Sequence, residues 1–215
     1  MQAMSSAGST SMDTVLDQLR ELIMIGELKP RTRLTHRDLA ERFGVSPMPV
    51  RDAVRQLIND GLIVAEGQKT IVVAPLNVDE FLDVMEMRLT LEPRALELAQ
   101  PATTDKDVKQ LRHMLKQSDV TGKPRKSVEQ HWLFHKRLYG PCKRPRMLAA
   151  IDAQHVHLNR YLLPSWGNAG VGLHWTLSEF QLLKLIEQKK TIEAIKFLKD
   201  DIEKAMLRVL RTIRT

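Results

Sequence analysis

Apolar residues recur at helical spacing in residues 13–26, and Gly26 ends that pattern. The repeated apolar positions are Val15, Leu19, Leu22 and Ile23. After a turn, Thr35 is placed to cap a short helix, and Asp38 three residues later completes an approximate capping box. We expect that helix to end at Gly44, because glycine readily adopts the left-handed conformation that follows many helices.

A second short helix is predicted from Ser46 and Pro47 to just before Gly61. Serine is a favoured N-cap, and proline is tolerated at the first helical position because its missing N–H would be unpaired there anyway. Two β-rich runs follow, residues 62–66 and 70–75, with a short turn between them. This order of elements is that of a winged helix-turn-helix. Such a module binds DNA or, alternatively, docks another protein.

Strand patterns end at Asn77, and the rest of the chain has helical periodicity. The expected helices cover 77–99, a segment that begins at Thr104, 125–140, 145–163, 177–189 and 191–213, with a loop at 163–172. The predicted fold class is therefore mainly α, with an N-terminal winged helix-turn-helix and a C-terminal all-helical bundle of six helices. The expected divisions are a disordered tail at 1–12, the winged domain at 13–76 and the helical domain at 77–215.

The formal net charge of +7 is typical of proteins with an anionic partner. However, residues 13–75 contain nine Lys/Arg and nine Asp/Glu, so DNA binding must be argued from the placement of particular residues. A single cysteine, Cys142, excludes an internal disulfide and fits a reducing cytoplasm. The chain has no apolar run of roughly eighteen residues and no signal-peptide pattern at its start, so we expect no membrane span.

A resemblance to the DNA-binding domain of GntR-type transcription regulators is carried by the run GELKPRTRLTHRDLAERFGVSPMPVRDAVRQLINDGLIVAEGQKTIVVAPLN. Its most specific part is VSPMPVRDAVRQL. The next run, VDEFLDVMEMRLTLEPRALELA, resembles the first helix of their FadR-like ligand domain, called FCD. The resemblance covers residues 13–210 and is stronger in the first half. It implies a cytoplasmic homodimer that binds a double-stranded DNA operator, with repression as the working expectation and activation as the alternative.

In a winged helix-turn-helix, residues near the start of the second helix reach base edges in the major groove. The expected DNA-binding residues are Arg37, Ser46, Met48, Arg51, Arg55, Lys69 and Thr70. Arg51 is suited to bidentate contact with a guanine, whereas Arg55 is suited to a phosphate. Arg37 matches a DNA-contacting position of the family, and Lys69 and Thr70 lie at the hairpin tip, where the wing meets the minor groove or the backbone. The alternative for Arg51 is an ion pair on a solvated helix face, although the adjacent Asp52 does not face it.

Three positions depart from the family pattern. Arg31 stands where the family usually has a glycine, so the turn there is expected to avoid a positive φ. Thr70 replaces a common glycine of the wing, which puts its close approach to the DNA backbone in doubt. Pro47 occupies a position that is arginine in some members, which removes one possible base contact. The operator sequence is expected to differ accordingly.

Many FCD domains bind a metal ion with one Asp and three His residues. In this chain the matching positions are His131, His135, Glu179 and Asp201. The two histidines are spaced i, i+4 and therefore project from one helix face, and the two carboxylates fall on apolar stripes. This set suits Zn, Mn, Fe or Ni without selecting among them. The alternative is that the metal site is lost and the four side chains hydrogen-bond one another in a polar core.

The resemblance also assigns arginines to the effector site. Arg88 and Arg160 match family positions that carry arginine, and either can clamp a carboxylate effector. Alternatively, Arg88 pairs with Glu92 one helical turn on. His155 and His157 are expected to be packing or surface residues. No enzymatic role is expected, because HWLFH lacks the glutamate that follows the first histidine in the HExxH motif of metallohydrolases, and no nucleophile constellation is present.

Overall fold

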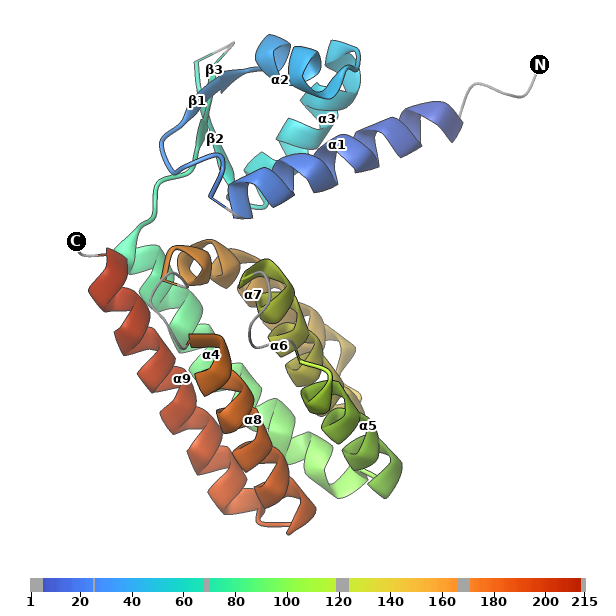
Figure 1. Ribbon diagram of the computed structural model, residues 1–215, viewed down its shortest axis with the longest axis vertical. Coiled ribbons are helices and arrows are strands. Elements are labelled where there is room, and N and C mark those ends of the chain that lie inside the picture. Colours follow the sequence, from blue (N-terminus) through green and yellow to red (C-terminus); the bar gives the residue numbers. More distant parts are fainter. Residues whose placement is uncertain (1–5, 25, 68–69, 119–123, 166–170, 214–215) are drawn as a thin grey trace. The chain divides into compact units, whose positions relative to one another are not determined.

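The computed structural model of the chain divides into two compact units, Met1–Leu76 and Asn77–Thr215. The described residues are 6–24, 26–67, 70–118, 124–165 and 171–213. Each unit has its own core of mainly apolar buried side chains. The two units are therefore described separately. Figure 1 shows helices with a small sheet in the first unit, and helices without strands in the described part of the second.

The N-terminal unit is a winged helix-turn-helix. Its helices are α1 (Ser6–Met24), α2 (His36–Phe43) and α3 (Pro47–Asn59). Of the apolar stripe predicted for the first helix, Val15, Leu19 and Ile23 are buried and Leu22 is partly buried, because α1 packs against α3. Thr35 caps α2 through a complete capping box with Asp38, and Gly44 ends it with φ 65°. Both ends of α2 therefore agree with the sequence prediction.

The sheet has three antiparallel strands in the order β1-β3-β2. The strands are β1 (Arg33–Thr35), β2 (Ile63–Glu66) and β3 (Thr70–Val73). The predicted hairpin corresponds to β2 and β3. Strand β1 was not predicted; it pairs Leu34 with Ile71 and so ties the start of α2 to the wing.

The expectation for Arg31 was wrong, because this residue has a φ of 68°. Its backbone N–H donates to the carbonyl of Val73 at 2.8 Å, and the N–H of Val73 donates to Thr32 at 2.9 Å. These two hydrogen bonds fix the turn where the chain enters β1. They offset the roughly 1–2 kcal/mol that a left-handed conformation costs a residue with a Cβ.

Helix α1 begins earlier than expected. We predicted a disordered tail over residues 1–12, but the helix extends back to Ser6, while residues 1–5 lie outside the described part. The segment contains no proline, and extending an existing helix adds one hydrogen bond per residue without a new nucleation cost.

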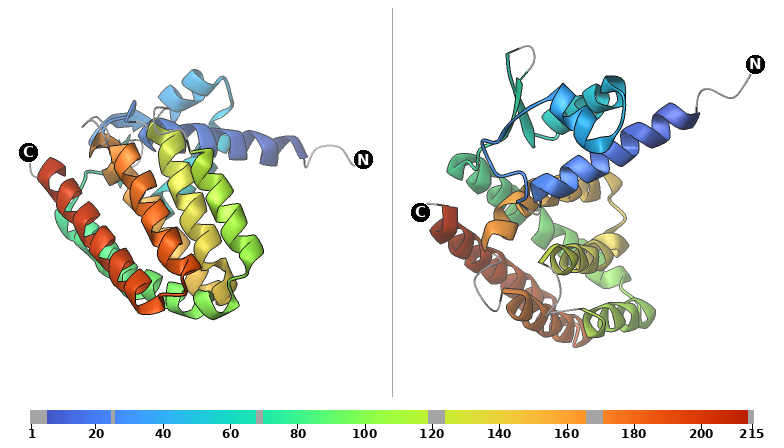
Figure 2. Two further views of the ribbon diagram at one scale, coloured as in Figure 1. Left: turned by 60° about the horizontal axis from the view of Figure 1, so that its bottom comes forward. Right: turned by 45° about the horizontal axis from the view of Figure 1, so that its top comes forward.

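The C-terminal unit is a bundle of helices. These are α4 (Val78–Ala99), α5 (Asp105–Lys116), α6 (Pro124–Tyr139), α7 (Pro145–Ser165), α8 (Val171–Glu187) and α9 (Thr191–Ile213). Helix α4 packs against α6, α7 and α9. Figure 2 (left) shows α9, α8, α6 and α5 side by side in a row. The predicted order of six helices is therefore found in the described residues.

Caps again mark the helix starts. The Asn77 side chain accepts hydrogen bonds from the N–H groups of Asp79 and Glu80, and Thr104 forms a capping box with Asp107. The expected loop at 163–172 is shorter than predicted, because α7 continues to Ser165 and α8 begins at Val171. Residues 166–170 lie outside the described part. Among the described helices, none combines the length and apolar character needed to cross a membrane.

Candidate functional site

The start of α3 presents polar and apolar groups to solvent. Ser46 is the N-cap residue, but its side chain makes no capping hydrogen bond. A capping hydroxyl accepts from the N–H of the second or third helical residue, and the third residue here is Pro49, which has no N–H. Met48, the second residue, is 64% exposed. The hydroxyl of Ser46 and the side chain of Met48 are therefore available to a partner molecule.

Two arginines share one face of α3. Arg51 and Arg55 are four residues apart and exposed, and neither forms an ion pair with any described residue. The alternative of an ion pair for Arg51 is thus not found in the described part of the chain. Arg37 differs, because its Nε donates to Oε1 of Glu41 at 2.8 Å on the exposed face of α2.

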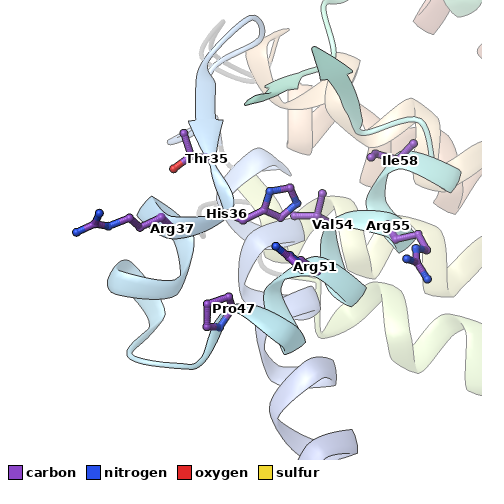
Figure 3. A pocket seen from close by; sticks show the side chains of 8 residues that line it. All are labelled: Thr35, His36, Arg37, Pro47, Arg51, Val54, Arg55 and Ile58. Carbon is purple, nitrogen blue, oxygen red and sulfur yellow. The ribbon is translucent and has the colours of Figure 1, made fainter. Parts of the chain in front are cut away.

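These cations surround a hollow of about 730 Å³ between α2 and α3. It is lined by Thr35, His36, Arg37, Pro47, Arg51, Val54, Arg55 and Ile58. Figure 3 shows the His36 ring close to Arg51 and Val54, with Arg37 and Arg55 on opposite sides. Sequence reasoning missed His36. Its position directly after the capping Thr35, in the first turn of α2, was the available signal.

The wing residues are only partly described. Thr70 begins β3, is partly buried, and lies opposite both Thr35 of β1 and Glu66 of β2. It is therefore a sheet residue rather than a free tip residue. Lys69, the other residue predicted there, lies outside the described residues.

A second polar site lies inside the C-terminal bundle. Potential metal-ligand atoms of His131, His135 and Glu179 lie within 4.8 Å of one another. Nδ1 of His131 is 2.7 Å from Oε1 of Glu179, and Nε2 of His135 is 3.9 Å from the same oxygen. Helix α6 supplies the two imidazoles through their i, i+4 spacing, and α8 supplies the carboxylate.

Asp201, the fourth expected ligand, is not in this group among the described residues. Its Oδ1 instead accepts a hydrogen bond from the hydroxyl of Ser178 at 2.8 Å. Burial lowers the pKa of His131 and raises that of Glu179; the nearby Asp201 offsets part of the first shift and adds to the second. The structure therefore brings three of the four predicted ligands together and places the fourth beside them.

The cluster continues into a hydrogen-bonded chain that sequence reasoning missed. Nδ1 of His135 is 3.0 Å from the hydroxyl of Tyr139, and that hydroxyl donates to Oε2 of Glu92 at 2.8 Å. Glu92 is fully buried and is bound by Nε of Arg88 at 2.5 Å. Because the Tyr139 proton is used toward Glu92, its oxygen accepts from Nδ1–H of His135. This leaves Nε2 of His135 unprotonated and able to bind a cation.

Burial controls the protonation of the cluster. It raises the pKa of Glu179 well above its usual range, and the nearby charge of Asp201 adds to this. Burial, followed by the charge of Arg88, lowers the pKa of His131 to about 4. Burial likewise lowers the pKa of His135 well below its usual range. Burial therefore favours the uncharged forms of both histidines and of Glu179.

Glu92 has the opposite behaviour. Burial opposes its ionisation, but the charge of Arg88 and the contact with His155 outweigh burial and hold the pKa of Glu92 well below its usual range. Nε2 of His155 is 3.2 Å from Oε1 of Glu92, and its ring stacks on Trp132 at a centroid distance of 3.6 Å. His155 is thus a packing residue, as expected, but it also belongs to the polar core.

The two arginines predicted to bind the effector, Arg88 and Arg160, lie near different glutamates of α4. Arg88 is paired with Glu92, which is the alternative considered above. Arg160 is buried, and its Nη1 lies 3.7 Å from Oε1 of Glu80. The two glutamates are about 18 Å apart along α4, at 1.5 Å rise per residue. The two guanidinium groups are therefore not held together as one clamp.

A winged helix-turn-helix followed by a helical bundle with a buried polar centre defines a class of transcriptional regulators. Residues 12–73 match the family described as bacterial regulatory proteins, gntR family, and residues 83–204 match the FCD domain. The chain belongs to the GntR family and carries an FCD effector-binding domain. Members of this family are transcriptional regulators and not enzymes, which confirms the expectation about enzymatic activity.

Similarity to individual proteins agrees with this assignment. The chain is 24% identical over 190 residues to the Nta operon transcriptional regulator of Aminobacter aminovorans, a match that covers 86% of this chain and 88% of that protein. A match to the uncharacterized HTH-type regulator YdhC of Bacillus subtilis (strain 168) is 30% identical over 103 residues. It covers 48% of this chain and 46% of YdhC, less than half of either protein. The solved structure of E. coli McbR/YncC shares the fold, with TM-score 0.77, 21% identity, and coverage of 94% and 97% of the two chains.

Proposed function

We propose that this protein is a cytoplasmic homodimeric repressor that binds a double-stranded DNA operator in a sequence-specific manner. The observation that carries the proposal is the position of Arg51, which is exposed near the start of α3 and forms no ion pair with any described residue. An unpaired guanidinium on the first turns of a recognition helix is suited to the O6 and N7 acceptors of a guanine.

The other residues of this surface divide by chemistry. Ser46 and Met48 lie beside Arg51 at the start of α3 and contact base edges, the methionine through apolar contact with a thymine methyl. Arg55, Arg37 and the wing residues Lys69 and Thr70 position the protein on the phosphate backbone. The hollow between α2 and α3 receives one strand of that backbone, because cations border it on both sides.

In the C-terminal unit, His131, His135 and Glu179 hold a divalent metal ion such as Zn, Mn, Fe or Ni. Two imidazoles and one carboxylate suit these metals, and the chain from Arg88 to Tyr139 supplies the outer hydrogen bonds that orient a histidine ligand. A metal ion held by these three residues would also be able to bind a carboxylate of an organic-acid effector. The charge of Arg88 is compensated by Glu92, so Arg88 is assigned no direct contact with the effector. Arg160, paired with Glu80, is assigned no direct contact.

Effector binding regulates the protein by shifting the population of dimer geometries. Two recognition helices bind two half-sites only at the spacing of a helical turn of DNA, so a change in their separation lowers operator affinity. This route requires no contact between the effector and the DNA-binding residues.

The test is fluorescence anisotropy with the protein's own promoter DNA and a scrambled duplex. R51A is expected to lose about 1–3 kcal/mol of binding to the operator, with little change on the scrambled DNA. R55A should weaken both equally and reduce the salt slope by about one. R146A, an exposed arginine of α7, is the control and should behave as wild type. An R51A variant that regulates normally would instead identify a protein-docking module.

A further inference from the structure

His36 lies in the hollow between α2 and α3 that the proposed DNA-binding arginines border. It is the first residue of α2, directly after the capping Thr35. Its ring is half-buried and lies close to Arg51 and Val54 (Figure 3). The imidazole forms no hydrogen bond, ion pair or ring contact with any described residue. Among the described residues that line the hollow, His36 has the side chain whose charge can change near neutral pH.

The groups that face His36 are cationic. Arg51 and Arg55 face the hollow from α3, and Arg37 borders it from α2. No carboxylate of a described residue lines the hollow. The acids of the neighbouring elements are engaged by a backbone N–H or by an arginine: Asp38 by Thr35, Glu41 by Arg37 and Glu66 by Arg33. An anion that enters the hollow therefore meets cations and no opposing carboxylate.

The start of α2 adds to this preference for an anion. The first N–H groups of a helix have no acceptor within the helix, and that end carries a partial positive charge. Thr35 caps one of these groups, the N–H of Asp38. In a helix-turn-helix the first helix of the motif crosses the DNA backbone, and here that helix is α2, which begins at His36. The anion expected beside the imidazole is therefore a phosphate of the DNA backbone.

We infer that His36 binds a DNA phosphate and takes up a proton as the complex forms, so that DNA affinity increases as the pH falls through neutrality. The inference rests on the proposed DNA binding. A phosphate beside an imidazole stabilises its protonated form. Because every DNA sequence carries phosphates, this proton uptake strengthens binding to any duplex and leaves the choice of operator to Arg51.

Fluorescence anisotropy with the protein's own promoter DNA and a scrambled duplex, at constant ionic strength with EDTA present, measures the effect. The wild-type protein should bind both duplexes about fivefold more tightly at about pH 6 than at about pH 8. H36Q keeps an N–H donor but cannot titrate, so its affinities should change by less than about twofold over this range. H113Q removes an exposed histidine of the C-terminal unit and should keep the wild-type pH dependence. Equal pH dependence of H36Q and wild type would overturn the inference.

Calorimetry measures the proton itself. Titrations at one pH in two buffers with different ionisation enthalpies give the number of protons taken up on DNA binding, which should be larger for wild type than for H36Q. His131 and His155 have pKa values of about 4 and stay neutral in this range. Thermal unfolding checks that H36Q is folded.

A separate variant distinguishes this inference from the proposed function. R51A should lose the preference for the operator and keep the pH dependence on the scrambled duplex. Operator preference without proton uptake at His36 would overturn the inference alone, whereas absence of DNA binding at every pH would overturn both.

Discussion

Tyr139 determines which nitrogen of His135 carries the proton. Its hydroxyl is buried between Nδ1 of His135 at 3.0 Å and Oε2 of Glu92 at 2.8 Å. Burial and the adjacent Glu92 raise the pKa of Tyr139 well above its usual range, so the hydroxyl keeps its proton. Glu92, which Arg88 keeps ionised, accepts the hydrogen bond that the Tyr139 hydroxyl donates. The direction of the whole chain is thus set by the charge of one buried arginine.

Substitution of Tyr139 by Phe should weaken metal binding without unfolding the protein. Loss of the hydroxyl frees Nδ1 of His135 from its acceptor, and loss of such an outer hydrogen bond typically costs about 10–100-fold in metal affinity. Competition with a chelating dye measures the affinity for Zn²⁺. Y161F is the matched control, because Tyr161 binds Asn77 and Glu80 instead. Equal affinities for Y139F and wild type would show that Tyr139 serves only packing.

His155 should make the stability of the fold depend on pH. Burial, followed by the charge of Arg88, lowers its pKa from 6.5 to about 4. Between these two pH values the unfolded chain binds a proton on His155 that the folded chain does not. The free energy of unfolding is therefore highest above pH 6.5 and decreases as the pH falls toward 4. The full effect is about 3 kcal/mol for this one histidine.

Urea unfolding at several pH values between 7 and about 4 measures this loss. H155Q keeps a donor near Glu92 but cannot titrate, so its unfolding free energy should fall less steeply with decreasing pH. His131 and His135 contribute to the pH dependence of both proteins. The contribution of His155 is therefore the difference between the wild-type and H155Q curves of unfolding free energy against pH. Parallel profiles for H155Q and wild type would contradict the assignment.

The two helices of the DNA-binding motif begin in different ways, and stability should report this. Thr35 accepts from the N–H of Asp38 at 3.1 Å, whereas the Ser46 side chain makes no capping hydrogen bond, and Pro49 at the third helical position has no N–H to offer it. T35A should therefore lower the free energy of unfolding by about 1 kcal/mol, and S46A should change it by less than about 0.5 kcal/mol. Chemical denaturation measures both. A cost for S46A equal to that of T35A would show that the serine hydroxyl caps α3 in solution.

Short-range signals account for the elements that the sequence predicted. Thr35 with Asp38, Gly44, Asn77 and Thr104 act on groups within four residues of themselves, so each can be recognised locally. Strand β1 could not be recognised in this way. It is three residues long, and its partner β3 lies more than thirty residues later, so its existence depends on a pairing that no local pattern encodes. The positive φ of Arg31 follows from the same pairing.

The residues of the polar core also fall into those that the sequence predicted and those that it did not. The i, i+4 spacing of His131 and His135 was visible, and Glu179 came from the family resemblance. Tyr139 was missed, and Glu92 was expected only as an alternative partner of Arg88, which it follows by one turn on the apolar face of α4. A charged pair on an apolar face was the available signal. That it reaches His135 depends on how α4 packs against α6, which the sequence does not reveal.

Regulation requires communication between units that have separate cores. The proposed DNA-binding residues lie in Met1–Leu76 and the metal cluster in Asn77–Thr215, and α4 begins directly after the boundary with Asn77 as its cap. Any effect of a metal or effector on DNA affinity is therefore a coupling free energy between two sites. Such coupling is typically about 1–3 kcal/mol, and it acts equally in both directions.

The coupling can be tested by measuring both directions. If Zn²⁺ changes operator affinity by some factor, bound operator must change Zn²⁺ affinity by the same factor, expected at about 5–150. Anisotropy titrations with apo and metal-loaded protein give the first factor, and dye competition with and without operator gives the second. H135A, which loses one ligand, should abolish both while keeping DNA binding through Arg51. Factors of one in both directions, with Zn²⁺ still bound tightly, would make the ion a structural element, because a ligand with equal affinity for both states shifts neither. The organic acid alone would then have to supply the differential binding on which regulation depends.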